Sequence, residues 1–423
     1  MTTTLTDMMA DIGREARQAS QILALATASQ KNQALIEMAR RLRQSSEEIC
    51  EANRQDVTAA AEKGLSPAMI DRLLLSDNRI ESMASSLESI SAMDDPVGKL
   101  EASWQQPNGL KFSKVKIPIG VIGMIYESRP NVTADAGALC LKAGNACILR
   151  GGSESLGSNK AIYKALLGGL KAAGLPETSI QLIPTSDRSA VGMLLGGLND
   201  NVDLIIPRGG KGLIARVQSD ARVPVLAHLE GLCHSYIHQD ADPAMAQSIV
   251  VNAKMRRTGV CGSTETLLID RAIAGSVLPE IVVALVDSGC EIRGDDASRA
   301  IASSITKRAT EEDFRTEYLA PVISVKIVEG VIEAIGHINS YGSGHTDAII
   351  TENQAIADQF QREVDSSIVM HNASTQFADG GEFGFGAEIG ISTGRLHARG
   401  PVGAEHLTTF KYLVHGSGQV RPE

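Results

Sequence analysis

The sequence predicts an α/β protein made of two doubly wound α/β domains and a small β arm for oligomerisation. From Lys111 onward, short runs of β-branched residues alternate with helical stretches, and a second alternating set begins near Cys233. Strands and helices that alternate in this way favour parallel sheets covered by helices on both faces. The chain has 423 residues, whereas one domain usually takes about 100–200, so we expect more than one domain.

The first hundred residues predict a helical entry layer. Ser66-Pro67 is typical of an N-cap followed by proline at the first helical position. Apolar residues recur with the 3.6-residue period of a helix, namely at Leu35, Met38, Ala39, Leu42 and Ile49.

The region after Lys111 predicts alternating strands and helices. The expected strands cover residues 115–119, 121–126, 147–150, 180–183, 204–206 and 223–226. The expected helices cover residues 134–142, 158–173, 188–195 and 212–219. The second set continues with a helix at 243–254, a strand at 264–269, a helix near 275–289 and a strand at 322–328. Residues 380–400 are dense in glycine, which indicates a long ordered loop with little regular structure.

These patterns predict three segments. Residues 1–230 would form the entry layer and a nucleotide-binding α/β domain, with the oligomerisation arm near 109–119. Residues 231–395 would form a catalytic α/β domain, and 396–423 a tail that returns to the first domain or to a neighbour. Pairing of the tail 407–420 with the arm predicts a homodimer or a larger even assembly, such as a tetramer.

Composition excludes several classes of protein. The net charge of −10 provides no basic surface for a nucleic acid backbone. No stretch is apolar enough to span a bilayer and no basic leader begins the chain, so we expect a cytoplasmic location without membrane contact. Six cysteines without a C-x-x-C pair favour free thiols, and no spacing of histidines and carboxylates indicates a metal site.

Cys261 is the strongest candidate for chemistry. Glycines flank it, and Arg256 and Arg257 precede it between an expected helix and an expected strand. Exposed backbone amides and nearby cations favour a thiolate. A buried structural thiol is the alternative, and it is the interpretation we keep for the other five cysteines.

Asn131 is the second candidate. It follows the strand at 121–126 and opens a helix, where its amide could donate to a developing oxyanion. A plain helix cap is the alternative. Two glycine loops, beginning at Arg150 and at Pro207, follow expected strands, where open α/β sheets bind nucleotides. Neither loop contains a G-x-G-x-x-G or P-loop motif. The polar run 337–347 has more hydrogen-bonding groups than a connection needs, with a solvated loop as the alternative.

Taken in order, these segments resemble the aldehyde dehydrogenase superfamily, and within it the gamma-glutamyl phosphate reductase family. The resemblance covers nearly the whole chain. Its most specific part is 328–349, with Ala334-Ile335, His337-Ile338, Tyr341-Gly342-Ser343 and His345-Thr346-Asp347. The segments 127–133, 381–390 and 400–403 are also characteristic. The resemblance implies an aldehyde dehydrogenase-like fold.

The resemblance implies roles for individual residues. Cys261 would be the nucleophile and Asn131 would lie beside the reacting carbonyl. A lysine in the wider superfamily contacts the cofactor ribose where Arg150 stands here, and a guanidinium suits the extra phosphate of NADP(H). The other cofactor contacts would be Gly151, Ser153, Pro207, Arg208, Gly209, Gly210 and Glu317. The substrate contacts would be Arg257, His345 and Glu382.

One departure concerns a glutamate. Hydrolytic aldehyde dehydrogenases carry a glutamate base after the strand expected at 223–226, and the match to Glu230 is ambiguous here. Glu230 is therefore not assigned as catalytic. An enzyme that reduces an acyl phosphate need not activate water, and the loss of that base would protect a thioester from hydrolysis.

The resemblance implies NADPH-dependent reduction of L-glutamyl 5-phosphate to L-glutamate 5-semialdehyde, with possible channelling of the substrate from glutamate 5-kinase. An acylating enzyme that passes its thioester to coenzyme A and a non-catalytic binding protein are the alternatives. The intact cysteine, asparagine and polar run weigh against the last.

Overall fold

The computed structural model describes residues 4–421 and divides them into two compact units. The first unit comprises the chain up to Ala227 together with Gly384–Gly390 and the residues from Val402 onward. The second comprises His228–Phe383 and Ile391–Pro401. The uninterrupted segments 231–395 and 396–423 expected from the sequence do not describe these units, because the chain returns to the first unit and leaves it again within the glycine-rich region.

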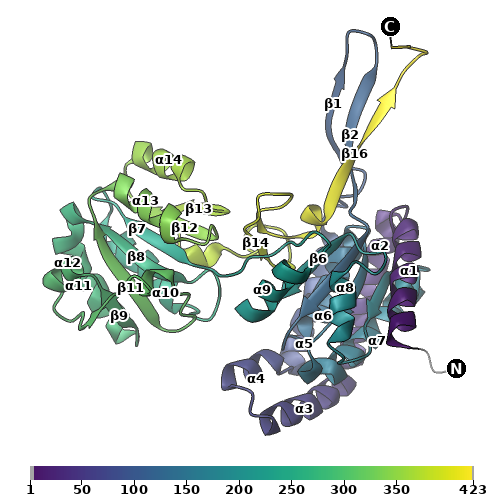
Figure 1. The fold of residues 1–423 in the computed structure, drawn as a ribbon, viewed down its shortest axis with the longest axis horizontal. Coiled ribbons are helices and arrows are strands. Elements are labelled where there is room, and N and C mark those ends of the chain that lie inside the picture. The colour runs from purple at the N-terminus through teal and green to yellow at the C-terminus, as the bar shows by residue number, and fades with distance from the viewer. Residues whose placement is uncertain (1–3, 422–423) are drawn as a thin grey trace. The chain divides into compact units, whose positions relative to one another are not determined.

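The first unit contains a four-stranded parallel sheet in the order β5-β4-β3-β6. Figure 1 labels its edge strand β6. Its strands are β3 (Val121–Tyr126), β4 (Ala146–Arg150), β5 (Ile180–Leu182) and β6 (Leu204–Arg208). Every residue of β3 and β4 is buried. Side chains of a strand point alternately to the two faces of the sheet, so full burial requires that both faces are covered, as the sequence predicted.

Helices surround this sheet. The entry layer consists of α1 (Leu5–Leu23), α2 (Ala28–Gln44), α3 (Ser46–Glu62), α4 (Pro67–Leu73) and α5 (Asp77–Ala92). The later helices are α6 (Asn131–Lys142), α7 (Leu156–Ala172), α8 (Ser189–Leu195) and α9 (Lys211–Asp220). Ser66 caps α4 as predicted. The apolar period from Leu35 to Ile49 spans two helices and not one, because the chain breaks at Ser45.

A separate antiparallel sheet forms the arm, with the order β1-β2-β16. Its strands are β1 (Leu100–Gln105), β2 (Lys111–Pro118) and β16 (Thr408–His415), and Lys111 pairs with His415. The predicted pairing of the tail with the arm is thus present within one chain. All residues of β1, and those of β16 after Thr408, are exposed.

The second unit contains a seven-stranded parallel sheet, ordered β10-β9-β11-β8-β7-β12-β13. The strands are β7 (Cys233–Ile237), β8 (Thr264–Asp270), β9 (Glu291–Gly294), β10 (Lys307–Arg308), β11 (Val322–Val328), β12 (Thr346–Ile350) and β13 (Ile368–His371). The helices are α10 (Pro243–Met255), α11 (Arg271–Asp287), α12 (Asp296–Ile301), α13 (Val331–Tyr341) and α14 (Gln354–Glu363). A short pair, β14 (Ile391–Ser392) and β15 (Gly400–Pro401), is the regular β structure of the glycine-rich region.

Strand β8 shows how the two faces are packed. Leu267 and Ile269 belong to a core that contains Val250 of α10 and Leu278 of α11. Leu268, between them, belongs to a second core with Ile338 of α13 and Phe360 of α14. The alternation of a strand therefore places helices on both faces of the sheet, which confirms the doubly wound architecture.

Two sequence expectations were wrong. The strand expected at 223–226 is reduced to one bridge between Val225 and Ile205, because Pro224 lacks the N–H that a continued ladder needs. The polar run 337–347 is not a solvated loop: it comprises the end of α13, a short link and the start of β12, with His337, His345 and Asp347 buried. No helix among residues 4–421 combines the length and hydrophobicity needed to span a bilayer.

Candidate active site

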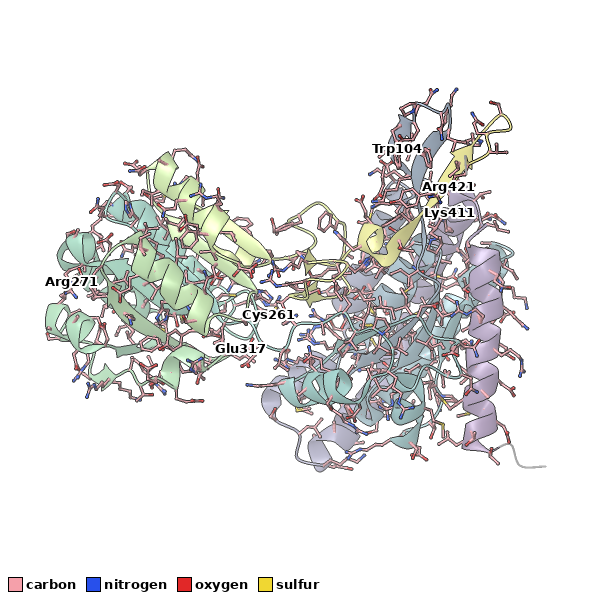
Figure 2. The ribbon with its side chains drawn as sticks, turned by 45° about the horizontal axis from the view of Figure 1, so that its top comes forward. Trp104, Cys261, Arg271, Glu317, Lys411 and Arg421 are labelled. Atoms are coloured by element: carbon pink, nitrogen blue, oxygen red, sulfur yellow. The ribbon has the colours of Figure 1, made fainter. Side chains whose placement is uncertain are left out.

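Cys261 lies in the turn between α10 and β8, where its side chain is half-buried. Cys233 donates from Sγ to the carbonyl oxygen of Cys261 at 3.1 Å. A Cβ atom added to Gly231 would lie 2.1 Å from the same oxygen, so only glycine allows this approach. The turn is therefore held from two sides. Figure 2 shows Cys261 among the side chains of the second unit.

Two imidazole rings lie beside the thiol, those of His228 and His345. One donor atom from each ring and the Cys261 sulfur all lie within 4.8 Å of one another. The ring centroids are 4.9 Å apart and the rings meet at 76°. Burial alone would raise the pKa of the Cys261 thiol, but the charge of His345 and a hydrogen bond from His228 hold that pKa well below its usual value. The structure thus supports a thiolate.

Sequence reasoning placed His345 at the substrate but missed His228. The sequence did contain a signal for His228. It follows the strand expected at 223–226, which is the position where hydrolytic aldehyde dehydrogenases carry their glutamate base. Two imidazoles and a thiol are also donors that zinc can accept. A zinc ion on the Cys261 sulfur would compete with its action as a nucleophile. We therefore interpret Cys261 as a nucleophilic thiol, and His228 and His345 as imidazoles that exchange protons with it.

Glu317 lies in the same unit and contacts Gly231, the residue that lies against the Cys261 carbonyl. Its carboxylate Oε1 accepts a hydrogen bond from the backbone N–H of Gly231 at 2.9 Å. Burial raises the pKa of Glu317, and the Gly231 bond opposes that effect. The loop after Glu317 is fixed by Glu265, which accepts from the N–H of Leu319 and pairs with Lys254 in the interior. The predicted contact of Glu317 with the nicotinamide ribose stays a prediction.

Asn131 is the first residue of α6, in the first unit. The capping position is Pro130, and no side chain caps the helix, so the alternative of a plain cap is wrong. The Asn131 amide Nδ2 instead donates to the Asp135 carboxylate at 2.8 Å. Because a carboxylate only accepts hydrogen bonds, this bond identifies Nδ2 as the atom that faces Asp135 and fixes the plane of the Asn131 amide. The second N–H of Nδ2 can then donate to a substrate.

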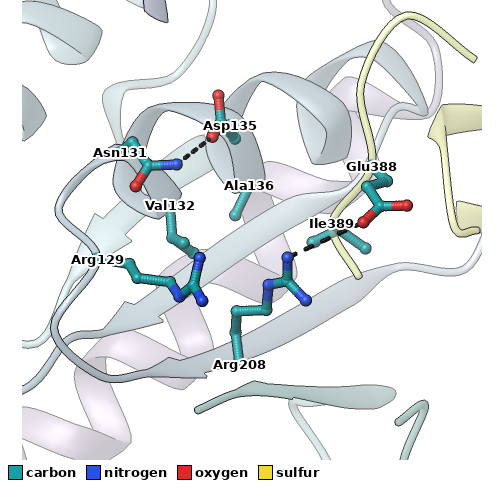
Figure 3. A pocket seen from close by; sticks show the side chains of 8 residues that line it. All are labelled: Arg129, Asn131, Val132, Asp135, Ala136, Arg208, Glu388 and Ile389. Carbon is teal, nitrogen blue, oxygen red and sulfur yellow. Dashed lines mark hydrogen bonds and ion pairs between the residues drawn. The ribbon is translucent and has the colours of Figure 1, made fainter. Parts of the chain in front are cut away.

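Figure 3 shows the small cavity that contains this pair. Arg129 and Arg208 also line it, and Arg208 pairs with Glu388 at 3.9 Å. Burial raises the pKa of Asp135 to about 6, opposed by the Asn131 bond and by Arg208. Asp135 is therefore ionised above about pH 6, and the bond to Asn131 is then strongest.

We expect Asp135→Ala to lower kcat about tenfold, because a hydrogen bond to a charged group is worth roughly 1.5–3 kcal/mol and its loss frees the Asn131 amide to rotate. Steady-state kinetics between pH 5 and 8 would measure this. Wild-type kcat should rise through pH 6 as Asp135 ionises, and Asp135→Asn should lack that rise. An unchanged pH profile in Asp135→Asn would contradict the positioning role.

The loop after β4 holds Arg150, Gly151 and Ser153. Arg150 is buried, and its guanidinium donates to the carbonyls of Gly151 and Ser186 at 2.7 and 3.1 Å. Its Nε is buried without a partner among the described residues. A Cβ atom on Gly151 would lie 2.1 Å from Asn159 Nδ2. A close backbone and an unsatisfied cationic donor fit a phosphate-bearing cofactor.

Pro207 and Arg208 end β6, and Gly209 and Gly210 link that strand to α9. A Cβ atom on Gly209 would lie 2.5 Å from an oxygen of Glu127. The same carboxylate oxygen accepts from the N–H of Gly210 at 3.1 Å. Both predicted cofactor loops thus lie at the carboxyl ends of strands in one sheet, where nucleotides bind.

Two predicted substrate residues lie outside the groups described so far. Arg257 and Glu382 have exposed side chains, and the contact that the structure gives Arg257 is a hydrogen bond to its backbone carbonyl from Gln376. Their roles remain predictions.

Comparison with known proteins identifies the family. A model of the aldehyde dehydrogenase family matches residues 5–312 and 289–411. Gamma-glutamyl phosphate reductase of Parvibaculum lavamentivorans is 60% identical over 415 residues, which cover 98% of both chains. The enzyme of the same name from Rhodospirillum rubrum is also 60% identical, over 98% of this chain and 97% of its own. The chain belongs to the gamma-glutamyl phosphate reductases of the aldehyde dehydrogenase family.

Solved structures agree with this assignment. The crystal structure of gamma-glutamyl phosphate reductase from Thermotoga maritima has a TM-score of 0.95 and 45% identity, covering 98% of this chain and 100% of that one. The aldehyde dehydrogenase family uses nicotinamide cofactors, and the loops after β4 and β6 suit one. An acetylating aldehyde dehydrogenase of Geobacillus thermoglucosidasius shares the fold, with a TM-score of 0.70 at 19% identity. Fold alone therefore does not separate the two reaction classes.

Proposed function

We propose that this protein reduces L-glutamyl 5-phosphate to L-glutamate 5-semialdehyde and phosphate, using NADPH and a thioester on Cys261. This is the second step of proline biosynthesis from glutamate. The observation that carries the proposal is the Cys261 thiol between His228 and His345, with its pKa well below the usual value. The identity of 60% to gamma-glutamyl phosphate reductases supports the choice of substrate.

The thiolate of Cys261 attacks the γ-carbonyl carbon of the substrate. The backbone N–H of Cys261 stabilises the oxyanion, and the phosphate leaves with its bonding electrons. The Asn131 amide is the second oxyanion donor that the family resemblance implies. NADPH, when bound, supplies the hydride that reduces the resulting thioester. Collapse of the thiohemiacetal releases the aldehyde and restores the thiolate.

NADPH is preferred to NADH in this proposal. Support comes from the buried Arg150, whose unsatisfied Nε and planar guanidinium suit the additional phosphate of NADPH. Pro207, Arg208, Gly209 and Gly210 would lie along the pyrophosphate, and Glu317 would hold the nicotinamide ribose. The position of residues 207–210 at the carboxyl end of β6 supports the first of these contacts, and the family resemblance supports the second.

A reverse assay tests substrate, phosphate and cofactor together. We expect glutamate 5-semialdehyde to reduce NADP⁺ only when inorganic phosphate is present, and faster than NAD⁺. Phosphate supplies the group that cleaves the thioester in this direction. Coenzyme A replacing phosphate would indicate an acylating aldehyde dehydrogenase. NADP⁺ binding without any turnover would indicate a non-catalytic protein.

The arm provides a surface for self-association in the cytoplasm. Its outer strands β1 and β16 carry exposed apolar side chains, including Trp104, Phe410, Tyr412 and Val414. Figure 2 labels Trp104 on the arm. Unpaired strand edges with apolar side chains favour pairing with another chain. An even homo-oligomer is therefore part of the proposal, and direct transfer of the acyl phosphate from glutamate 5-kinase is a further part of it.

A further inference from the structure

We propose that His228 and His345 form an acid–base pair on the Cys261 thiol, in which His228 takes the thiol proton and returns it to the departing phosphate. The return step rests on the proposed function, whereas the proton transfer from the thiol does not. The inference depends on the convergence of three side chains from separate parts of the second unit within 4.8 Å.

The tautomer of His228 is fixed by its surroundings. Its Nδ1 lies 2.8 Å from the carbonyl oxygen of Ile391. A carbonyl only accepts hydrogen bonds, so Nδ1 must carry a proton and donate it. In the neutral ring this leaves Nε2 with a lone pair, and Nε2 is then the nitrogen that can take the thiol proton. Ile391 thus orients His228 as a base in the way that a carboxylate or carbonyl orients other catalytic histidines.

His345 contributes charge from the opposite side. Its side chain is fully buried, and its Nδ1 lies 2.8 Å from Thr346 Oγ1 and 3.6 Å from Cys233 Sγ. Its ring also forms a side-chain hydrogen bond with Cys261, and its charge lowers the pKa of that thiol. A proton on this ring therefore stabilises the adjacent thiolate.

Acidic groups near the Cys261 sulfur do not outweigh the stabilisation of the thiolate by His228 and His345. Glu317 is the acidic neighbour that interacts with the charge of Cys261, and Glu230 in turn interacts with Glu317. Burial raises the pKa of Glu317, and the N–H of Gly231 donates to its carboxylate. Cys233 is buried with a raised pKa and is therefore a neutral neighbour. Cys261 is the thiol that ionises.

The protons balance over one turnover. His228 accepts the proton of the Cys261 thiol, and the thiolate forms a bond to the γ-carbonyl carbon. The carbon–oxygen bond to phosphate then breaks, and the phosphate oxygen takes the proton from the His228 imidazolium. Reduction of the thioester by NADPH releases the aldehyde and returns the sulfur as a thiolate. His228 is then neutral again, and one proton from solvent restores the Cys261 thiol, which equals the one proton that the overall reduction consumes.

Alkylation of Cys261 by iodoacetamide tests the first half without substrate or cofactor. The full-length protein would be alkylated between pH 4 and 10, and peptide mass spectrometry would follow Cys261 separately from the other five cysteines. We expect His228→Gln and His345→Gln each to move the inflection upward by about one pH unit or more, and the double variant to approach a free cysteine at about pH 8.5.

His371→Gln is the matched control. His371 also lies in the second unit, is half-buried, and has a ring nitrogen 2.9 Å from the carbonyl oxygen of Thr351. Its profile should equal that of the wild type. Unchanged profiles in both test variants would overturn the proposal, as would one tightly held zinc ion per chain that disappears in either variant. A shifted profile in a protein that fails the reverse assay would leave the acid–base pair standing and remove the proposed function.

A pair of acyl donors tests the return of the proton. p-Nitrophenyl acetate releases a phenolate that needs no proton, whereas phosphate leaves faster when protonated. The two donors would be compared at a pH above the inflection of the alkylation profile of His228→Gln, where its Cys261 is a thiolate. There the variant should react with the ester as fast as the wild type does, but with glutamyl phosphate about tenfold or more slowly. Equal deficits with both donors would overturn the return step.

Discussion

Replacing Cys261 by serine is expected to abolish NADPH oxidation by glutamyl phosphate, a loss on the order of 10⁴-fold or more. A serine hydroxyl stays protonated beside His228 and His345, where the thiol ionises, so neither attack nor a thioester is available. Initial rates at 340 nm, at saturating substrate, would measure the loss. Cys261 is half-buried and packs against a small apolar cluster that includes Ala378 and Ile391, but serine has nearly the same size, so the thermal midpoint should change little.

Cys50→Ser is the control for this experiment. Cys50 is also a half-buried free thiol, and its pKa is raised by burial and by Asp77 rather than lowered. Full activity is expected in Cys50→Ser. Appreciable turnover by Cys261→Ser, with the fold intact, would show that the reaction does not pass through this sulfur.

Replacing Asn131 by alanine is expected to lower kcat about 10²–10³-fold, the usual effect of removing one oxyanion donor. The Asn131 amide is held by Asp135 at 2.8 Å, so its remaining N–H is already oriented and need not reorganise during the reaction. KM should change much less than kcat, because the donor acts where negative charge develops. Steady-state kinetics of the purified variant would measure both constants.

Alkylation of Cys261 provides the control for Asn131→Ala. Iodoacetamide forms no oxyanion, so the alkylation rate and its pH profile should equal those of the wild type. A loss of alkylation in parallel with kcat would mean that Asn131 acts on the thiol or on the fold. A kcat within threefold of the wild type would remove Asn131 from the mechanism. Asp135→Ala should fall between the wild type and Asn131→Ala.

Much of the architecture could be predicted from the sequence, because helices and strands repeat every few residues and their apolar patterns can be recognised within short segments. The strand at 121–126 is a continuous apolar run, and the strands at 147–150 and 264–269 contain the apolar runs 147–149 and 267–269, as burial on both sheet faces favours. All three strands are confirmed. The errors also have local causes. The strand expected at 223–226 ignored Pro224, and the period through Ile49 ran across the break at Ser45.

The sequence by itself determined the doubly wound α/β class, the reactive context of Cys261 and the resemblance to a family, since each depends on residues close together in the chain. Tertiary structure alone decided which side chains serve the sulfur. His228, Cys261 and His345 are separated by 33 and 84 residues, and strands β7, β8 and β12 must pair before they can meet. The hydrogen bond from Asn131 to Asp135 was also not predictable from the sequence. An asparagine and an aspartate four residues apart in a helix can form such a bond, but the spacing alone does not require it. Proximity across long stretches of chain follows from sheet order, and no local pattern encodes that order.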